Sequence, residues 1–200
     1  GGFDPYSASK SSQDIIANSY KESFFKNKKN IIIIRAGNIV GGGDWEISRL
    51  IPEVFNSIYN KKKIILRNPN AIRPWQHIFD VVNGIILVLH KKNSKIQKKS
   101  IIYNIGPSHK SNITVLDLVK KIKKRHENLK ISFSKKNIHF RESKILKLSS
   151  NLFKKEVGWK PKININKSLE LIQEWYDEFY IRKNNIFEFT VKQIKGFFDN

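Results

Sequence analysis

The sequence predicts an α/β fold in which short apolar strands alternate with amphipathic helices. Residues 31–35 begin with four consecutive isoleucines, a β-branched run typical of a strand in a parallel sheet covered on both faces. Segments with helical spacing of apolar residues precede and follow this run, and such alternation is the pattern of α/β proteins. With 200 residues, of which 40% are hydrophobic, the chain can form a substantial core in one or two domains.

The first helix is expected over residues 6–25, because Pro5 suits a first turn and Asp4 suits the capping region before it. Thr114, with Asp117 three residues on, predicts the start of a later helix. The other expected elements are, in chain order, a strand at 31–35, a glycine-rich loop at 36–45, a helix at 48–60, a strand at 63–66, a loop at 67–75, a helix at 79–90, strands at 100–105 and 131–133, and helices at 114–126, 150–157, 166–182 and 187–198.

Composition excludes several classes of site. There is no cysteine, so disulfides, thiolate nucleophiles and cysteine metal sites are ruled out, and a cytoplasmic location is expected. No His, Asp and Glu group has metal-ligand spacing, so no metal is expected. No run of about 18 apolar residues occurs, so no membrane partner is expected. Because the chain begins at Gly1 and contains no methionine, we expect the true N-terminus to lie upstream.

The formal net charge of +21 raises the question of nucleic-acid binding. Only seven of the 38 basic residues are arginine, and lysine accompanies abundant isoleucine and asparagine, three residue types with A/T-rich codons. The lysines are spread along the chain, whereas a site for single-stranded nucleic acid would interleave basic and aromatic residues. We therefore interpret the charge as solvated surface and expect no nucleic-acid partner; a functional basic face that binds nucleic acid is the alternative. Either surface would attract anions nonspecifically.

Tyr6 and Lys10 form a Tyr-x-x-x-Lys element near the start of the first helix. Positions four apart lie on the same helical face. A cation within about 4–6 Å favours the ionised phenol, which would make Tyr6 a usable acid/base group. By itself this is a weak pattern, and two exposed side chains of an amphipathic helix are the alternative.

The next element gives the pair a context. A strand ends in Arg35-Ala36-Gly37-Asn38, with Gly41 beyond, and loops at the carboxyl ends of such strands are where ligands bind. A Tyr/Lys helix followed by a strand and an Arg-x-x-Asn-x-x-Gly loop resembles the extended short-chain dehydrogenase/reductase family.

Further motifs resemble the nucleotide-sugar dehydratases of that family, in particular CDP-glucose 4,6-dehydratases. In order along the chain they are Gly1-Gly2-Phe3-Asp4-Pro5-Tyr6, Gly41-Gly42-Gly43-Asp44-Trp45, Arg49-Leu50-Ile51-Pro52, residues 67–77, Gly158-Trp159-x-Pro161 and Glu174-Trp175-Tyr176. The resemblance implies the C-terminal part of an NAD-binding Rossmann fold, formed by residues 1–45 with parts of 76–105. It also implies a smaller α/β substrate-binding lobe, formed by 46–75 and 106–182, followed by an unassigned extension at 183–200.

The resemblance implies NAD as cofactor and a CDP-glucose-like nucleotide sugar as substrate. Tyr6 would take the proton of the sugar 4-hydroxyl while hydride leaves C4, and Lys10 would hold the nicotinamide ribose. Ala36 would line the nicotinamide pocket, so that Tyr6, Lys10 and Ala36 are the cofactor-binding candidates. Such enzymes supply deoxysugars for surface polysaccharides such as the O-antigen of lipopolysaccharide.

The substrate-binding candidates are polar or cationic side chains of the same motifs, namely Asn38, Arg49, Arg67, Arg73, His77 and Arg141. In a lysine-rich chain, an arginine that is retained suggests that its fork geometry is needed, as for phosphate. The alternatives are surface ion pairs for the arginines, a turn asparagine for Asn38 and a structural histidine for His77. Arg141 stands where the family carries histidine, near the expected nucleotide-base end of the pocket.

In the family, the glycine-rich dinucleotide loop and further acid/base residues precede the Tyr/Lys helix, so the resemblance places them upstream of Gly1. We therefore expect the 200-residue chain alone to be inactive, and the full-length protein to be a homodimer or larger. The alternatives are another nucleotide-sugar dehydratase or epimerase, or a noncatalytic fragment that binds substrate or mediates dimerisation.

Overall fold

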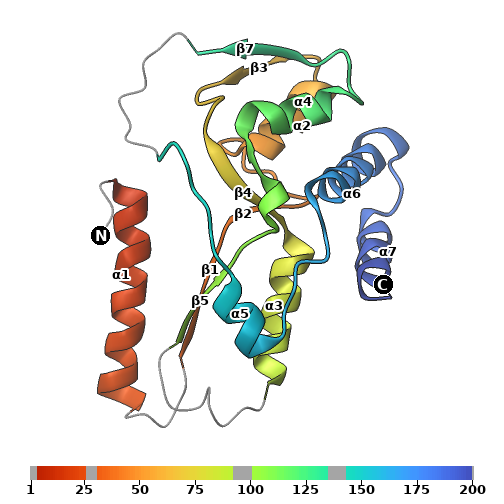
Figure 1. Ribbon diagram of the computed structural model, residues 1–200. Helices are drawn as coiled ribbons and strands as arrows, with labels where there is room; N and C mark the ends of the chain where they lie inside the picture. The colour runs from red at the N-terminus through yellow and green to blue at the C-terminus, as the bar shows by residue number, and fades with distance from the viewer. Residues whose placement is uncertain (1–3, 26–30, 92–100, 135–142, 200) are drawn as a thin grey trace.

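The structure, a computed structural model, describes residues 4–25, 31–91, 101–134 and 143–199 (Figure 1). The α-helices are α1 (Pro5–Tyr20), α2 (Leu50–Tyr59), α3 (Ile78–His90), α4 (Val115–Lys123), α5 (Asn151–Val157), α6 (Ile165–Asp177) and α7 (Ile186–Phe198). The strands are β1 (Ile32–Ala36), β2 (Asn38–Val40), β3 (Lys63–Leu66), β4 (Ile72–His77), β5 (Ile101–Ile105), β6 (Asn112–Thr114) and β7 (Lys130–Phe133). Short helical turns are η1 (Lys21–Phe25), η2 (His109–Ser111) and η3 (Glu178–Arg182), of which η1 and η3 are π-helical.

The strands form three small sheets. β1 pairs in parallel with β5, and β3 pairs in parallel with β7. The third sheet has the order β2-β4-β6, with β2 parallel and β6 antiparallel to the central β4. Parallel pairing between strands joined through helices confirms the predicted α/β class.

Two hydrophobic clusters hold these layers together. In one, residues of α3 and α5 pack against Tyr103 and Ile105 of β5 and against the isoleucines at alternate positions of β1. In the other, α2, α4 and α6 surround β3 and the indole of Trp75. Helix α1 lies on the other side of the β1–β5 pair, with its N-terminus at the end where β1 finishes (Figure 1). The predicted division into two domains stays a prediction.

The sequence interpretation was wrong over residues 67–75, which we expected to be a loop because they contain two prolines. Residues 72–77 instead form β4, the central strand of its sheet, and the next residue already begins α3. Strands β2 and β6 were also missed, because each has only three residues and no alternating pattern to reveal it. The predicted helix at 114–126 is shorter and ends at Lys123.

Helix α3 begins without a connecting loop because His77 both ends β4 and caps the helix. The His77 Nδ1 atom accepts a hydrogen bond from the backbone N–H of Phe79 at 3.3 Å. His77 is only 2% exposed, and burial lowers its pKa to about 4. The imidazole is therefore neutral at pH 7.

Asp80 joins α3 to the segment between α5 and α6. Its carboxylate, which is fully buried, accepts hydrogen bonds from the backbone N–H groups of Lys162 at 2.8 Å and Ile163 at 3.1 Å. Its carbonyl oxygen accepts a hydrogen bond from Trp159 Nε1 at 2.9 Å. The Gly158-Trp159-x-Pro161 motif is thus fixed to the first turn of α3.

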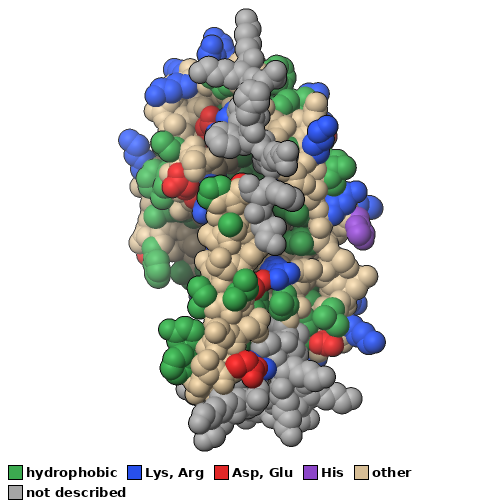
Figure 2. Space-filling view, turned by 90° about the vertical axis from the view of Figure 1, so that its left-hand side faces the viewer, with side chains coloured by type: hydrophobic (Ala, Val, Ile, Leu, Met, Phe, Trp, Pro, Cys, Tyr) green, Lys and Arg blue, Asp and Glu red, His purple; other side chains and the backbone are tan. Residues whose placement is uncertain are grey.

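On the face that α1 forms part of, the charged side chains are dispersed. Lysine and arginine side chains lie among acidic, polar and hydrophobic ones and do not gather on one element of that face (Figure 2). Within the described ranges, no helix combines the length and the apolar character needed to cross a membrane.

Replacing Asp80 by alanine should lower the free energy of unfolding by about 2–4 kcal/mol, because two buried backbone N–H groups lose their acceptor. Chemical denaturation of the purified chain measures this change. The matched control is Asp199→Ala, at an exposed position after α7, which should change stability by less than about 0.5 kcal/mol. Equal effects of the two substitutions would contradict the structural role of Asp80.

The stability of the chain should fall between pH 7 and pH 5 because of His77. The unfolded histidine titrates near pH ~6.5, so the unfolded state binds the proton more tightly than the folded state, whose pKa is lowered to about 4. The contribution is fully present above pH ~6.5, and about 2 kcal/mol of it is lost by pH 5.

The variant His77→Asn keeps a capping acceptor but cannot take up the proton, so its stability should depend less on pH. Denaturation curves at pH 7 and pH 5 measure the difference. The exposed His109, changed to asparagine, is the control. A pH dependence unaltered by His77→Asn would show that this histidine is not the group responsible.

Candidate functional site

Tyr6 and Lys10 lie on the first three turns of α1. Asp4 caps this helix by accepting a hydrogen bond from the Ser7 backbone N–H at 3.0 Å, and Pro5 occupies the first turn. Lys10 Nζ lies 5.7 Å from the centroid of the Tyr6 ring, so the ammonium and the phenol share one face. Tyr6 is 71% exposed, and Lys10 is exposed as well. The pair is therefore open to a ligand on this side of α1.

An ion pair connects α1 to the sheet. Arg35, on β1, donates from Nε to Asp14 Oδ2 of α1 at 3.0 Å, and its Nη2 reaches the same oxygen. Its side chain points away from the face of β1 that packs under α3 and α5, since the alternate residues Ile34 and Ala36 face that cluster. No side chain of α1 itself is buried.

Ala36, Gly37 and Asn38 form the turn from β1 into β2. The Gly37 backbone N–H donates to the Ile105 carbonyl at 3.2 Å, which holds the turn at the carboxyl end of β5. A Cβ atom on Gly37 would lie 2.5 Å from the Pro74 carbonyl oxygen, so a larger residue has no room here. Asn38 pairs with Trp75 in the sheet, which places Asn38 beside β4.

Arg73 lies within β4 and is only 6% exposed. Its Nη1 donates to the neighbouring Ile72 carbonyl at 2.9 Å. His77 ends the same strand, and Gln76 between them has both side-chain polar atoms buried without a partner among the described residues. A buried amide that makes no hydrogen bond is unfavourable, so Gln76 marks a place where water or a ligand group would be stabilising.

The segment after residue 142 runs beside β4. Ile72 N–H donates to the Lys144 carbonyl at 2.9 Å, and Leu146 N–H donates to the Ile72 carbonyl at 3.1 Å. Further on, Leu148 lies against Gly106, where a Cβ atom would be 2.9 Å from the Leu148 carbonyl oxygen. Arg141 lies outside the described residues, but the segment that follows it reaches the strand that carries Arg73.

Arg49 and Arg67 are both exposed. Arg49 precedes α2, and its Nη1 donates to Asp44 Oδ2 at 3.1 Å within the glycine-rich loop. Arg67 follows β3 and is close enough to the partly buried Glu53 to lower that carboxyl's pKa, although burial of Glu53 raises it more strongly. For Arg49 the surface ion pair, which we had kept as the alternative, is therefore present.

The structure thus brings together Asn38, Arg73 and His77, which lie on the neighbouring strands β2 and β4. Ala36 lies two residues before Asn38, at the end of β1, and Arg35 of β1 bonds to the helix that carries Tyr6 and Lys10. The functional roles of these residues stay predictions. No group of three or more His, Cys, Asp and Glu side chains that could hold a metal ion occurs in the described part of the chain.

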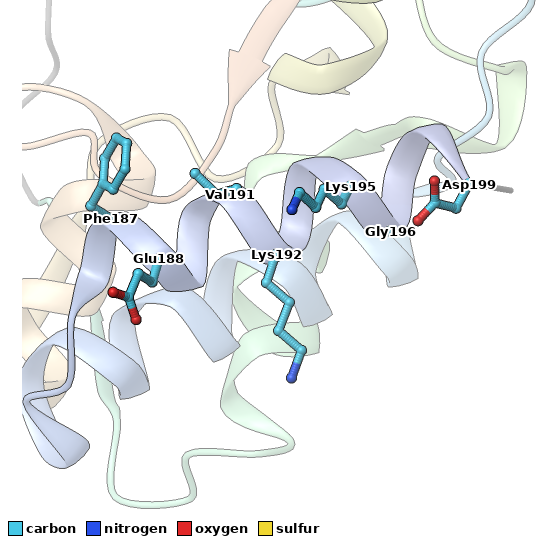
Figure 3. A pocket seen from close by; sticks show the side chains of 7 residues that line it. All are labelled: Phe187, Glu188, Val191, Lys192, Lys195, Gly196 and Asp199. Carbon is cyan, nitrogen blue, oxygen red and sulfur yellow. The ribbon is translucent and has the colours of Figure 1, made fainter.

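One hollow in the described residues lies away from this group. It has a volume of about 600 Å³, and its lining comes entirely from the open side of α7 and the residue that follows it. Figure 3 shows that the labelled residues lie along this helix and do not surround an enclosed space. None of the predicted site residues lines it, so we assign it no role in binding.

The sequence interpretation also missed the contacts that shape the glycine-rich loop. A Cβ atom on Gly42 would lie 2.2 Å from Trp175 Cγ, and the Tyr176 hydroxyl donates to the Asp44 carbonyl at 2.6 Å. The Gly41-Gly42-Gly43 and Trp175-Tyr176 motifs were both visible in the sequence. Nothing local shows that they touch, because about 130 residues separate them.

Residues 2–172 match the family model described as GDP-mannose 4,6 dehydratase. The chain is 31% identical over 203 residues to CDP-glucose 4,6-dehydratase of Salmonella typhimurium, a match that covers 98% of this chain and 56% of that protein. It is 34% identical over 119 residues to dTDP-D-glucose 4,6-dehydratase of Dictyostelium discoideum, covering 59% of this chain and 25% of that one. The chain spans about half the length of the first curated relatives that it matches.

Solved structures with a similar fold include dTDP-glucose 4,6-dehydratase from Bacillus anthracis in complex with NAD. Its TM-score is 0.71 at 24% identity, over 89% of this chain and 53% of that one. UDP-glucuronic acid 4-epimerase from Bacillus cereus, in complex with UDP-glucuronic acid and NAD, has a TM-score of 0.77 at 18% identity, over 90% and 55% of the two chains. The fold is thus that of Rossmann-type dehydratases and epimerases. The match over residues 2–172 and the 31% identity over 98% of the chain show that the chain belongs to the GDP-mannose 4,6-dehydratase family of nucleotide-sugar dehydratases.

Proposed function

We propose that this chain supplies the Tyr/Lys helix and the nucleotide-sugar-binding part of an NAD-dependent CDP-glucose 4,6-dehydratase. The observation that carries the chemistry is the exposed face of α1, where the Lys10 ammonium lies 5.7 Å from the Tyr6 ring centroid. The choice of CDP-glucose is supported by the 31% identity to the Salmonella enzyme over 98% of the chain. The motif over residues 67–77 supports the same choice through its resemblance, and its residues 72–77 form β4, which carries Arg73 and pairs with the strand of Asn38.

The residues of the β1 end and of α1 fit the nicotinamide end of NAD. Ala36 presents only a methyl group, and Gly37 leaves no room for a side chain, so the turn is narrow. The Lys10 ammonium reaches Gln13 Oε1 at 3.4 Å and is otherwise open to ribose hydroxyls. The 200 residues contain no Gly-x-x-Gly-x-x-Gly sequence that would hold the pyrophosphate. The fit therefore concerns the nicotinamide end only.

The proposed reaction converts CDP-glucose to CDP-4-keto-6-deoxyglucose and water. Tyr6, as the phenolate, accepts the proton of the sugar 4-hydroxyl and becomes the neutral phenol. Lys10, on the same helical face, favours the phenolate form that the step requires. NAD, when bound, supplies a reversible hydride acceptor. Oxidation at C4, loss of water across C5 and C6 and reduction at C6 then balance without an external oxidant.

Arg73 and Asn38 are proposed to bind the diphosphate and the sugar. Arg73 is nearly buried, and a charge-assisted hydrogen bond from guanidinium to phosphate is stronger where water is excluded. The Asn38 amide can both donate and accept, which suits a sugar hydroxyl or a phosphate oxygen. His77, neutral and with Nδ1 accepting from Phe79, carries its proton on Nε2 as a donor.

A comparison of sugar nucleotides tests the substrate. The full-length protein that contains this chain should dehydrate CDP-glucose with added NAD, and mass spectrometry should detect the loss of one water. UDP-glucose, dTDP-glucose and GDP-mannose are the competing substrates, and epimerised product is scored separately. Faster turnover of one of these, or an epimerised product, would overturn the CDP-glucose assignment.

We further propose that the 200-residue chain alone is inactive. A homodimer, a cytoplasmic location and a role in O-antigen deoxysugar synthesis stay predictions.

Tyr6→Phe should lower kcat of the full-length protein by about 10²- to 10⁴-fold, the usual contribution of a positioned acid/base group. Tyr20→Phe, the same substitution at an exposed position of the same helix, is the matched control and should leave kcat unchanged. Single-turnover rates with CDP-glucose measure both. Turnover by Tyr6→Phe at the parental rate would remove Tyr6 from the reaction.

Arg73→Lys should weaken binding of CDP by about 10- to 100-fold, since a hydrogen bond to a charged group contributes about 1.5–3 kcal/mol. It should weaken binding of CMP less, because CMP lacks the second phosphate. Calorimetric titration gives both affinities, and Arg125→Lys at an exposed position is the control. If Arg73→Lys reduces CDP and CMP binding equally, Arg73 does not bind the second phosphate.

A further inference from the structure

The glycine-rich loop Gly41–Trp45 packs closely against the indole of Trp175. A Cβ atom on Gly42 would lie 2.2 Å from Trp175 Cγ, and one on Gly43 would lie 3.1 Å from Trp175 Cζ2. Gly43 also has a φ of +78°, a backbone conformation that glycine adopts most readily. The orientation of this one indole ring therefore determines the path of the loop.

Helix α7 fixes the orientation of that ring. Trp175 Nε1 donates a hydrogen bond to Thr190 Oγ1 at 2.8 Å. The Thr190 hydroxyl in turn donates to the Ile186 carbonyl at 2.7 Å, so its lone pair is directed at the indole. Trp175 is 8% exposed, and a buried indole N–H without an acceptor would be costly.

The far end of the loop is held by Tyr176, which follows Trp175 on α6. The Tyr176 hydroxyl donates to the Asp44 carbonyl at 2.6 Å. The ring of Trp45 packs against those of Trp175 and Tyr176 at centroid distances of 5.8 and 5.7 Å. The Asp44 carboxylate also accepts a hydrogen bond from Arg49 Nη1 at 3.1 Å. The position of the loop therefore affects the position of Arg49, a predicted substrate-binding residue.

We propose that α7 is a positioning element for the nucleotide-sugar site, acting through Thr190 and Trp175 on the loop Gly41–Trp45. The substrate part of this proposal rests on the proposed function, in which the loop backbone approaches the sugar diphosphate. Thr190 touches no substrate; it holds the indole that holds the loop. Residues 186–198 lie beyond the part of the chain that the family model matches, which ends at residue 172.

A second hydrogen bond between α6 and α7 provides a control. It distinguishes a role of α7 in positioning the loop from a role in packing against α6 alone. Gln193 Nε2 donates to the Leu171 carbonyl at 2.9 Å, so it attaches α7 to α6 at a residue other than Trp175. Gln193→Leu and Thr190→Val each remove one hydrogen bond between α7 and α6. Only Thr190→Val removes the acceptor of the indole.

The experiment compares these two variants, together with Thr190→Ser, which keeps the hydroxyl. Hydrogen exchange at the backbone amides of residues 41–45 is measured in the 200-residue chain. Affinity for CDP-glucose and the values of kcat and KM are measured in the full-length protein. Thermal unfolding of all three variants reports how much each bond contributes to global stability.

Thr190→Val should speed exchange in the loop and raise the dissociation constant for CDP-glucose, each about fivefold, the loss expected for one hydrogen bond of about 1 kcal/mol. It should raise KM and leave kcat nearly unchanged. Thr190→Ser should restore the parental values, and Gln193→Leu should lower the melting temperature without either effect.

Indistinguishable loop exchange in Thr190→Val and Gln193→Leu would overturn the proposal. So would faster exchange with unchanged affinity in a parent that binds CDP-glucose. If the parent binds no sugar nucleotide, the proposed function fails. A difference in loop exchange between the two variants would then still support the link from α7 to the loop.

Discussion

Asp80 lies where β4 has just become α3, and its buried carboxylate accepts the backbone N–H groups of Lys162 and Ile163. Its own carbonyl accepts the indole N–H of Trp159, a residue of the cluster that packs on β5. From Ile163 the chain continues into α6, which packs in the other cluster. One short stretch at the start of α3 therefore connects both hydrophobic clusters to the strand that carries the predicted substrate-binding residues.

At three glycines the backbone comes very close to a residue distant in sequence, and these contacts shape the candidate site around β4. Gly37 lies against Pro74, Gly106 lies against Leu148, and Gly42 lies against Trp175. In each case a Cβ atom would come within 3 Å of the neighbour, so the glycine is required by space. These contacts place the turn after β1, the segment following residue 142 and the loop before α2 around Arg73 and Asn38.

The helix that carries Tyr6 and Lys10 is held differently. It buries none of its side chains, and an ion pair between Asp14 and Arg35, whose arginine is half exposed, joins it to β1. Exposed ion pairs contribute little to stability, typically less than about 1 kcal/mol. Asn38 and Arg73, by contrast, lie on strands that pair directly in one sheet. Within the described residues, the half of the site proposed to bind substrate is thus built on paired strands, and the half proposed to do the chemistry lies on a helix that an ion pair joins to β1.

The sequence by itself determined the elements whose patterns are local. The isoleucine run became β1, residues 63–66 became β3, and the capping residues Asp4 and Thr114 stand where α1 and α4 begin. It also placed Tyr6 beside Lys10, because residues four apart on a helix need no tertiary structure to meet. Ordered motifs along the chain were enough to indicate the family.

Only the tertiary structure decided the contacts between distant segments. β4 forms despite Pro74 because β2 and β6 pair with it on both sides, and neither three-residue strand has a pattern of its own. The acceptor role of Asp80 depends on backbone groups about 80 residues away, and the path of Gly42 depends on an indole even further along the chain. Such contacts follow from how the two clusters pack. Local periodicity carries no information about them, because it records which face a residue takes and not what lies opposite that face.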